Sequence, residues 1–192
     1  MNSKILVIYS NFDKDGYNKE ILKNTLDFLE KEKKDYKLLD LYKMNYNPVL
    51  DDKEIILKKG KNYQETLKIQ KDIKERDILI FIYPIWWGTM PAILKGFIDR
   101  TFTAGFAYKY VNSIPRGLLK GKKAFIFSTS GVRGLYNKIT YNKYTRGLRK
   151  DVLRFCGISS KSIIIGKALN IKKKNEKEKI KKIVYKKLNN FL

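Results

Sequence analysis

Short apolar runs alternate along this chain with longer stretches in which apolar residues recur every three or four positions. The apolar runs predict buried strands, because a strand covered on both faces of a parallel sheet carries few polar side chains. They lie at residues 4–9, 36–41, 77–83, 123–128 and 162–165. The periodic stretches predict helices with one apolar face. They lie at residues 17–33, 62–74, 91–102, 143–155 and 174–189.

This alternation predicts an α/β fold with a doubly wound parallel sheet and right-handed crossovers. Residues 103–121 carry several glycines and a proline, and we expect a long loop there. The Lys-rich helix at 174–189 has an apolar stripe that suits docking onto the sheet, and a membrane-surface helix is the weaker alternative. No internal repeat or low-complexity linker divides the chain, so we expect a single domain over residues 1–192.

The 192 residues include 42 Lys and Arg against 19 Asp and Glu, which gives a formal net charge of +23. Such a charge invites a nucleic-acid interpretation. The cations are mostly Lys, however, whereas base recognition favours Arg, and they are spread along the whole chain. We therefore interpret the charge as a solvated surface bias and expect no specific nucleic-acid partner. The charge should still speed association with anionic small molecules.

The chain has no histidine and a single cysteine, Cys156. The lack of histidine excludes Ser-His-Asp and Cys-His catalysis, imidazole metal sites and a histidine pH switch. One cysteine excludes an internal disulfide framework, so a cytoplasmic location is the default expectation. No apolar run approaches the ~20 residues of a transmembrane segment. Residues 1–9 are interpreted as leading into a first strand rather than as a signal peptide.

Ligands of a doubly wound sheet bind beyond the carboxyl ends of the strands, so three loops are candidates for a site. Residues 11–18 lack the Gly-x-Gly-x-x-Gly and Gly-Lys-Ser/Thr patterns, which disfavours a dinucleotide Rossmann site and a P-loop. Their helix start at Gly16 can hold one phosphate group through backbone N–H groups, although Asp13 and Asp15 are anionic. An ordinary strand–helix turn is the alternative.

Both tryptophans of the chain, Trp86 and Trp87, stand side by side after the strongest predicted strand. Their loop is stiff because Pro84 and Pro91 bound it, and flat indoles with backbone N–H groups suit a planar heterocycle. The alternative is that Trp86 packs in the core and Trp87 covers a dimer contact. The third loop, at 128–136, offers small hydroxyl residues and two glycines that let the backbone approach a ligand closely.

The motif that begins at Pro84 and ends at Arg100 reads Pro-Ile-Trp-Trp-Gly-Thr-Met-Pro-Ala-Ile-Leu-Lys-Gly-Phe-Ile-Asp-Arg, and Gly-Phe-Ala-Tyr follows at 105–108. This motif resembles that of the flavodoxin-like NAD(P)H:quinone oxidoreductases, the DT-diaphorase-type group. Residues 40–48 and 119–124 resemble the same family. The resemblance runs from the first strand to about residue 157.

The resemblance implies a flavodoxin-like, five-stranded parallel sheet of order 2-1-3-4-5 with helices on both faces. It implies a flavoprotein with FMN, or alternatively FAD, as cofactor and NAD(P)H as electron donor. Two-electron, ping-pong hydride transfer through flavin N5 to a quinone-like acceptor would follow, in a homodimer with the site at the subunit interface. A non-catalytic electron carrier or a regulatory subunit of an ion-efflux system is the alternative. No readable motif specifies an adenine pocket, which favours FMN.

The resemblance also implies which residues form the site. The cofactor-binding residues would be Asn11, Gly16, Tyr17 and Asn18 at the flavin phosphate, Pro84, Ile85, Trp86 and Trp87 along the isoalloxazine, and Ser128, Thr129, Ser130 and Gly131 at its pyrimidine side. Tyr136 matches a family tyrosine that approaches the flavin, so we expect it to be catalytic. Asn142 falls near the place of a catalytic histidine in some relatives.

The chain departs from the family pattern at three of these positions. The family often has His where this chain has Asn11, and Ser where it has Gly16. At Asn142 an amide can donate a hydrogen bond but cannot become a cation. Anionic reduced flavin would therefore rely on Tyr136 and backbone N–H groups, with Arg133 either assisting or remaining a solvated loop cation.

Overall fold

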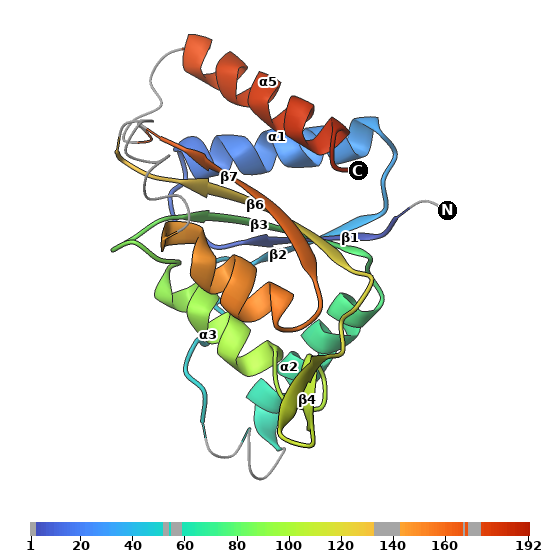
Figure 1. Ribbon diagram of the computed structural model, residues 1–192. Helices are drawn as coiled ribbons and strands as arrows, with labels where there is room; N and C mark the ends of the chain where they lie inside the picture. Colours follow the sequence, from blue (N-terminus) through green and yellow to red (C-terminus); the bar gives the residue numbers. More distant parts are fainter. Residues whose placement is uncertain (1–2, 52–53, 55–58, 133–142, 167, 169–173) are drawn as a thin grey trace.

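The computed structural model describes residues 3–51, 54, 59–132, 143–166, 168 and 174–192. Its centre is a five-stranded parallel sheet with the strand order β2-β1-β3-β6-β7 (Figure 1). The strands are β1 (Ile5–Tyr9), β2 (Tyr36–Asp40), β3 (Ile78–Pro84), β6 (Lys123–Thr129) and β7 (Ser159–Ile165). Numbered among themselves, these five strands have the order 2-1-3-4-5, so the expected doubly wound sheet is confirmed.

Helices cover both faces of this sheet, as expected. One face carries α1 (Tyr17–Lys31) and α5 (Lys174–Asn189), and the other carries α2 (Gly60–Lys74), α3 (Ala92–Thr101) and η2 (Gly147–Arg154) (Figure 1). Alternate residues of β1 serve the two layers, because Ile5 and Val7 join the α1–α5 core whereas Leu6 and Ile8 join the opposite core. Burial on both faces explains the continuous apolar runs. Within the described ranges, no helix is long and apolar enough to cross a membrane.

Residues 103–121 do not form the single long loop that we expected. They contain an antiparallel hairpin of β4 (Tyr108–Val111) and β5 (Ile114–Gly117). The sequence does not predict β5, because its Pro115 and Gly117 are typical of turns and weaken a strand pattern. The glycine has a packing reason, since a Cβ at Gly117 would lie 2.3 Å from the backbone that follows η2.

The helix expected at 143–155 is wound differently over most of its length. Gly147–Arg154 is a π-helix, and residues 143–146 before it are α-helical. Gly157 follows with φ of 90°, the left-handed conformation predicted for a C-terminal cap. Eight residues make too few turns for an apolar pattern to distinguish the two windings, so periodicity predicted the helix but not its winding.

A fully buried arginine ties α3 to the segment that precedes α2. Arg100 Nε lies 2.9 Å from Glu54 Oε2, and Nη2 donates to the Asn62 carbonyl at 2.8 Å. Its guanidinium carbon lies 4.6 Å from the centre of the Tyr46 ring. Charges remain in a protein interior only where they are paired and hydrogen-bonded. This network therefore holds Tyr46, Asn47 and Glu54, which lie between β2 and α2, against α3.

We predict that Arg100→Ala lowers the free energy of unfolding by about 3–5 kcal/mol, because it leaves the Glu54 carboxylate buried without its partner. Lys95→Ala is the matched control on the same helix. It removes the solvent-exposed Lys95–Asp99 ion pair and should cost at most about 1 kcal/mol. Urea unfolding of the three proteins measures both values. Equal losses in the two variants would contradict the structural role of Arg100.

Candidate functional site

The carboxyl ends of β1, β3 and β6 are neighbours in the sheet, and hydrogen bonds join the segments that follow them. Asn18, in the first turn of α1, donates from Nδ2 to Thr129 Oγ1 at the end of β6 over 2.8 Å. The Ile85 N–H, just after β3, donates to the Thr129 carbonyl at 2.8 Å. The Ser10 N–H, just after β1, donates to the Ile82 carbonyl at 3.0 Å. The three loops singled out in the sequence therefore meet at one edge.

The start of α1 offers backbone donors at this edge. Gly16 is the N-cap residue and has extended backbone angles that any residue adopts, so glycine is not required there for its conformation. Because glycine has no side chain, the N-cap residue accepts no hydrogen bond from the first N–H groups of the helix. These N–H groups are then available to bind an anion. Tyr17 follows, half-buried, with a pKa raised by burial and by the Glu176 carboxylate.

Two buried amide side chains stand beside these donors. Asn11 and Asn18 are each 4% exposed, and their Oδ1 atoms have no hydrogen-bond partner among the described residues. A buried acceptor without a donor costs free energy, so a ligand hydroxyl placed here would be stabilising. The edge thus combines N–H donors that suit a phosphate with oxygen acceptors that suit the hydroxyl groups of a flavin side chain, and the residues present fit such a cofactor.

The loop after β3 holds both tryptophans outside the core. Pro84 ends the strand, and beyond Ile85 the backbones of Trp86 and Thr89 exchange hydrogen bonds of 3.0 Å. Between them Trp87 and Gly88 have φ of 51° and 77°. A left-handed conformation is uncommon for a bulky residue, so the tight turn, and not local preference, dictates the backbone of Trp87.

The exposure of the two indoles decides between the interpretations of this loop. The Trp87 side chain is fully exposed, and that of Trp86 is 38% exposed. Trp86 is therefore not a core residue, and the alternative that placed it there is wrong. Exposed indoles at a rigid turn present flat apolar surface to a ligand or a partner.

The end of β6 supplies buried hydroxyl groups. Ser128, Thr129 and Ser130 are 0%, 3% and 6% exposed, whereas Gly131 after them is exposed. Ser128 Oγ donates to the Ile163 carbonyl on β7 at 3.3 Å. These contacts fix the strand end, so its backbone and hydroxyl groups form a preorganised polar border of the site.

Three expected residues cannot be placed relative to this edge. Tyr136, Asn142 and Arg133 lie outside the described residues. The catalytic roles of Tyr136 and Asn142 therefore remain predictions, and the choice between an assisting and a solvated Arg133 stays open. Within the described part of the chain, no cluster of three Cys, Asp or Glu side chains suits a metal ion.

The sequence analysis missed two aromatic residues at the same edge. The centre of the Phe12 ring lies 5.7 Å from that of Trp86 and 5.8 Å from that of Tyr42. Phe12 follows β1, Tyr42 follows β2 and Trp86 follows β3, so the three rings gather beyond three neighbouring strands. The signal that would have found them is an aromatic residue within three positions after each of these strand ends.

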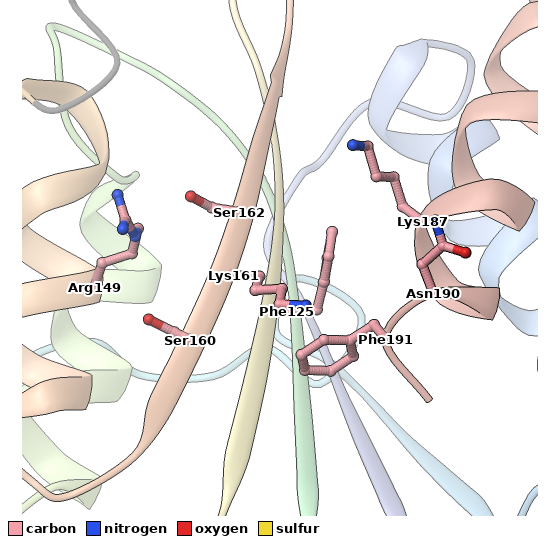
Figure 2. Close-up of a pocket in the computed structure, with 8 residues that line it drawn as sticks. All are labelled: Phe125, Arg149, Ser160, Lys161, Ser162, Lys187, Asn190 and Phe191. Atoms are coloured by element: carbon pink, nitrogen blue, oxygen red, sulfur yellow. The ribbon is translucent and has the colours of Figure 1, made fainter.

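A cavity of about 380 Å³ lies elsewhere, along β7 (Figure 2). Figure 2 shows Arg149, Ser160 and Ser162 on one side of this strand and Lys187 and Phe191 on the other. The lining residues come from β6, from the first half of β7, from η2, and from the end of α5 and the residues just after it, not from the loops at the carboxyl edge. The cavity is therefore separate from the candidate site.

Comparisons with known proteins agree with this architecture. The family model Flavodoxin_2, described as a flavodoxin-like fold, matches residues 3–188. The ribosyldihydronicotinamide dehydrogenase (quinone) of Homo sapiens is 30% identical over 177 residues, covering 80% of this chain and 77% of that protein. The NAD(P)H dehydrogenase (quinone) 1 of Cavia porcellus is 28% identical over 179 residues, covering 80% of this chain. This match spans 64% of the Cavia porcellus protein, slightly less than two thirds of its length.

Solved structures share the fold over nearly the whole chain. Smu.1420 from Streptococcus mutans UA159 is 36% identical with a TM-score of 0.84, covering 98% of this chain and 100% of that one. The FMN-dependent NADH-azoreductase of Bacillus anthracis, solved in complex with FMN, is 16% identical with a TM-score of 0.77, covering 98% of each chain. At that identity the azoreductase shows the fold alone.

The sheet order and the three loops at its carboxyl edge define a protein of the flavodoxin-like class. With the family match and the quinone-dehydrogenase relatives, the chain belongs to the flavodoxin-like NAD(P)H:quinone oxidoreductase family. The resemblance stated from the motif at 84–100 is thereby confirmed.

We predict that Thr129→Val lowers the free energy of unfolding by about 1–3 kcal/mol, because the buried Asn18 Nδ2 loses its acceptor. The double variant Asn18→Leu, Thr129→Val should recover most of this loss, since both polar partners are then apolar. Chemical denaturation of the parent and the two variants measures the coupling. A double variant less stable than Thr129→Val alone would contradict the importance of this hydrogen bond.

Proposed function

We propose that this chain is a flavin-dependent NAD(P)H oxidoreductase that passes two electrons to a quinone-like acceptor in a ping-pong cycle. The main observation behind this proposal is that three features lie at one edge of the sheet. They are a helix start without a side-chain cap, two exposed indoles on neighbouring residues, and a row of buried hydroxyl residues. The names of its relatives, NAD(P)H dehydrogenase (quinone) 1 and ribosyldihydronicotinamide dehydrogenase (quinone), support the same reaction class. A bound flavin supplies the hydride chemistry, while the protein binds and orients the reactants.

Each side of the edge has a proposed binding role. The first turn of α1, with Asn11, Gly16, Tyr17 and Asn18, receives the phosphate and the hydroxyl-bearing side chain of the flavin. The segment Pro84, Ile85, Trp86 and Trp87 lies along the ring system, and Ser128, Thr129, Ser130 and Gly131 border its polar pyrimidine edge. Their fixed geometry avoids an ordering cost on binding.

The overall reaction consumes one proton, because NAD(P)H, a proton and a quinone give NAD(P)⁺ and a hydroquinone. The chain has no histidine to carry that proton. We propose that Tyr136 and Asn142 hydrogen-bond to the reacting groups and that the proton comes from solvent. Backbone N–H groups at the edge stabilise negative charge on the reduced cofactor.

We propose FMN as the cofactor and FAD as the alternative. Support comes from the FMN complex of the Bacillus anthracis azoreductase, which shares the fold. The chain has no readable adenine-binding motif, and its net charge of +23 favours the encounter with anionic FMN and NAD(P)H.

We propose further that the protein is a cytoplasmic homodimer with its site at the subunit interface. Trp87 is fully exposed, and Tyr110 and Ile114 of the hairpin are 62% and 54% exposed, so apolar surface is available for a second copy. Cys156 is a free, buried thiol, and burial raises its pKa to about 11, so the thiol stays protonated. A free thiol is compatible with the reducing conditions of the cytoplasm.

We predict that the purified protein reduces menadione at the expense of NAD(P)H, and that Trp87→Ala lowers kcat/KM about tenfold. Loss of a stacking surface for the reactants gives this magnitude. Trp87→Phe, which keeps a ring, should retain most of the activity, and thermal unfolding should show that neither variant is destabilised, because the side chain is fully exposed.

Steady-state kinetics with NADH and with NADPH test the proposal. A colourless protein that stays inactive after addition of FMN and of FAD would contradict it. A flavin-loaded protein without turnover would instead favour the electron-carrier or regulatory-subunit alternative.

A further inference from the structure

The strand β7 is the last strand on one side of the parallel sheet, and no strand of the described ranges pairs with its outer edge. The Ser159 N–H and the Ile165 carbonyl form hydrogen bonds with the residues that flank β6, so the backbone groups of these two residues face the sheet. Backbone groups alternate in direction along a parallel strand, so those of Ser160 and Ile164 point away from β6. A strand edge with such outward groups is a template for an added strand.

The cavity of about 380 Å³ is lined from both faces of β7 (Figure 2). Arg149 of η2 lines it on one face. Lys161 and Lys187 line it on the other face, beside the rings of Phe125 and Phe191, whose centres lie 5.1 Å apart. Because the two faces meet at the outer edge of β7, the cavity follows that edge. Side chains of an extended chain alternate between two faces, so such a chain fits this cavity better than a compact ligand does.

The lining of this cavity is cationic. It includes Arg149, Lys161 and Lys187, and no Asp or Glu is among the described residues that line it. The Asp151 carboxylate of η2 lies 3.5 Å from Arg146 and is not part of the lining. Cations on both faces of the edge attract carboxylates and repel a basic segment.

A second copy of this chain is a poor occupant of the edge. Pairing between the β7 strands of two copies would bring the cationic linings of both cavities together, and like charges on neighbouring strands are destabilising. A lysine on an edge strand, here Lys161, is a common protection against such self-pairing. The same lysine attracts an added strand that carries carboxylates, so the charge of the edge selects an acidic partner.

We propose that β7 binds an extended acidic segment of another protein, which adds one further strand to the sheet. Backbone hydrogen bonds with Ser160 and Ile164 provide affinity, as in other cases of strand addition. Carboxylates on alternate residues of the segment meet Arg149 on one face and Lys161 and Lys187 on the other. This surface is separate from the carboxyl edge of the sheet, and its role does not depend on the flavin or on the reaction proposed above.

The probe is the acetylated and amidated peptide Glu-Glu-Val-Glu-Glu-Val, which has about the length of a typical strand and carries Glu on both faces in either register. Isothermal titration calorimetry measures its affinity for the full chain. Lys187→Glu should weaken the binding about tenfold, because it reverses a charge of the lining. Lys186→Glu is the matched control, since it makes the same charge change at the neighbouring exposed residue of α5, outside the lining. It should weaken the binding at most about threefold, because solvent and salt screen it.

A second pair of variants separates strand addition from general charge attraction. Ser160→Pro removes an N–H that points away from β6, so the pairing with β6 is kept while peptide binding should weaken at least about tenfold. Ser160→Ala keeps this N–H and should bind the peptide within about a factor of two of the parent protein. Thermal unfolding checks that both variants are folded.

A modified peptide makes the same test without any change to the protein. The peptide N-methylated at its two central residues keeps every charge but loses a backbone donor toward β7 in either register. It should bind at least about tenfold more weakly than the unmodified peptide.

Three results would overturn the inference: equal weakening by Lys187→Glu and Lys186→Glu, equal binding of the two peptides, or no binding of the unmodified peptide. An oligothymidylate of equal charge that binds as tightly, and loses as much affinity in Lys187→Glu, would overturn it in favour of a general polyanion site. The proposed function is tested separately, because menadione reduction should be unchanged in Lys187→Glu.

Discussion

The buried hydrogen bond from Asn18 to Thr129 is the contact on which the arrangement of the site depends. It joins residues 111 positions apart in the chain, one in the first turn of α1 and the other at the end of β6. The Thr129 carbonyl also accepts a hydrogen bond from the Ile85 N–H. Thr129 therefore connects the start of α1 and the tryptophan loop to the end of β6. Parallel pairing brings the strand ends to one edge, and this contact fixes the segments that follow them.

The positive charge of the chain and the groups that form the candidate site lie in different parts of the molecule. The net charge of +23 is spread along the chain, whereas the edge is built from amides, hydroxyl groups, backbone N–H groups and indoles. Such a preorganised site suits a cofactor that carries the redox chemistry itself. The surface charge then affects how fast anionic reactants arrive rather than how they react. The absence of histidine fits this division, because no side chain of the described edge serves as an imidazole-like acid or base.

The sequence predicted the five sheet strands well, because strands buried on both faces leave an unmistakable apolar run. It predicted the three loops of the site for the same reason, since each follows such a strand. It failed where structure depends on distant contacts. Pro115 and Gly117 disguise a hairpin strand, and the π-helical winding of Gly147–Arg154 has no distinct pattern. Phe12 and Tyr42 were missed because an aromatic residue in a loop has no periodicity to reveal its partner.

Mass spectrometry of the small molecule released when the purified protein is denatured tests the central claim most directly, namely that this sheet edge is a flavin site. The account predicts FMN at one molecule per chain, and a lower content that rises to this value after incubation with FMN would agree with it. A protein that releases no flavin and takes up neither FMN nor FAD would contradict the account.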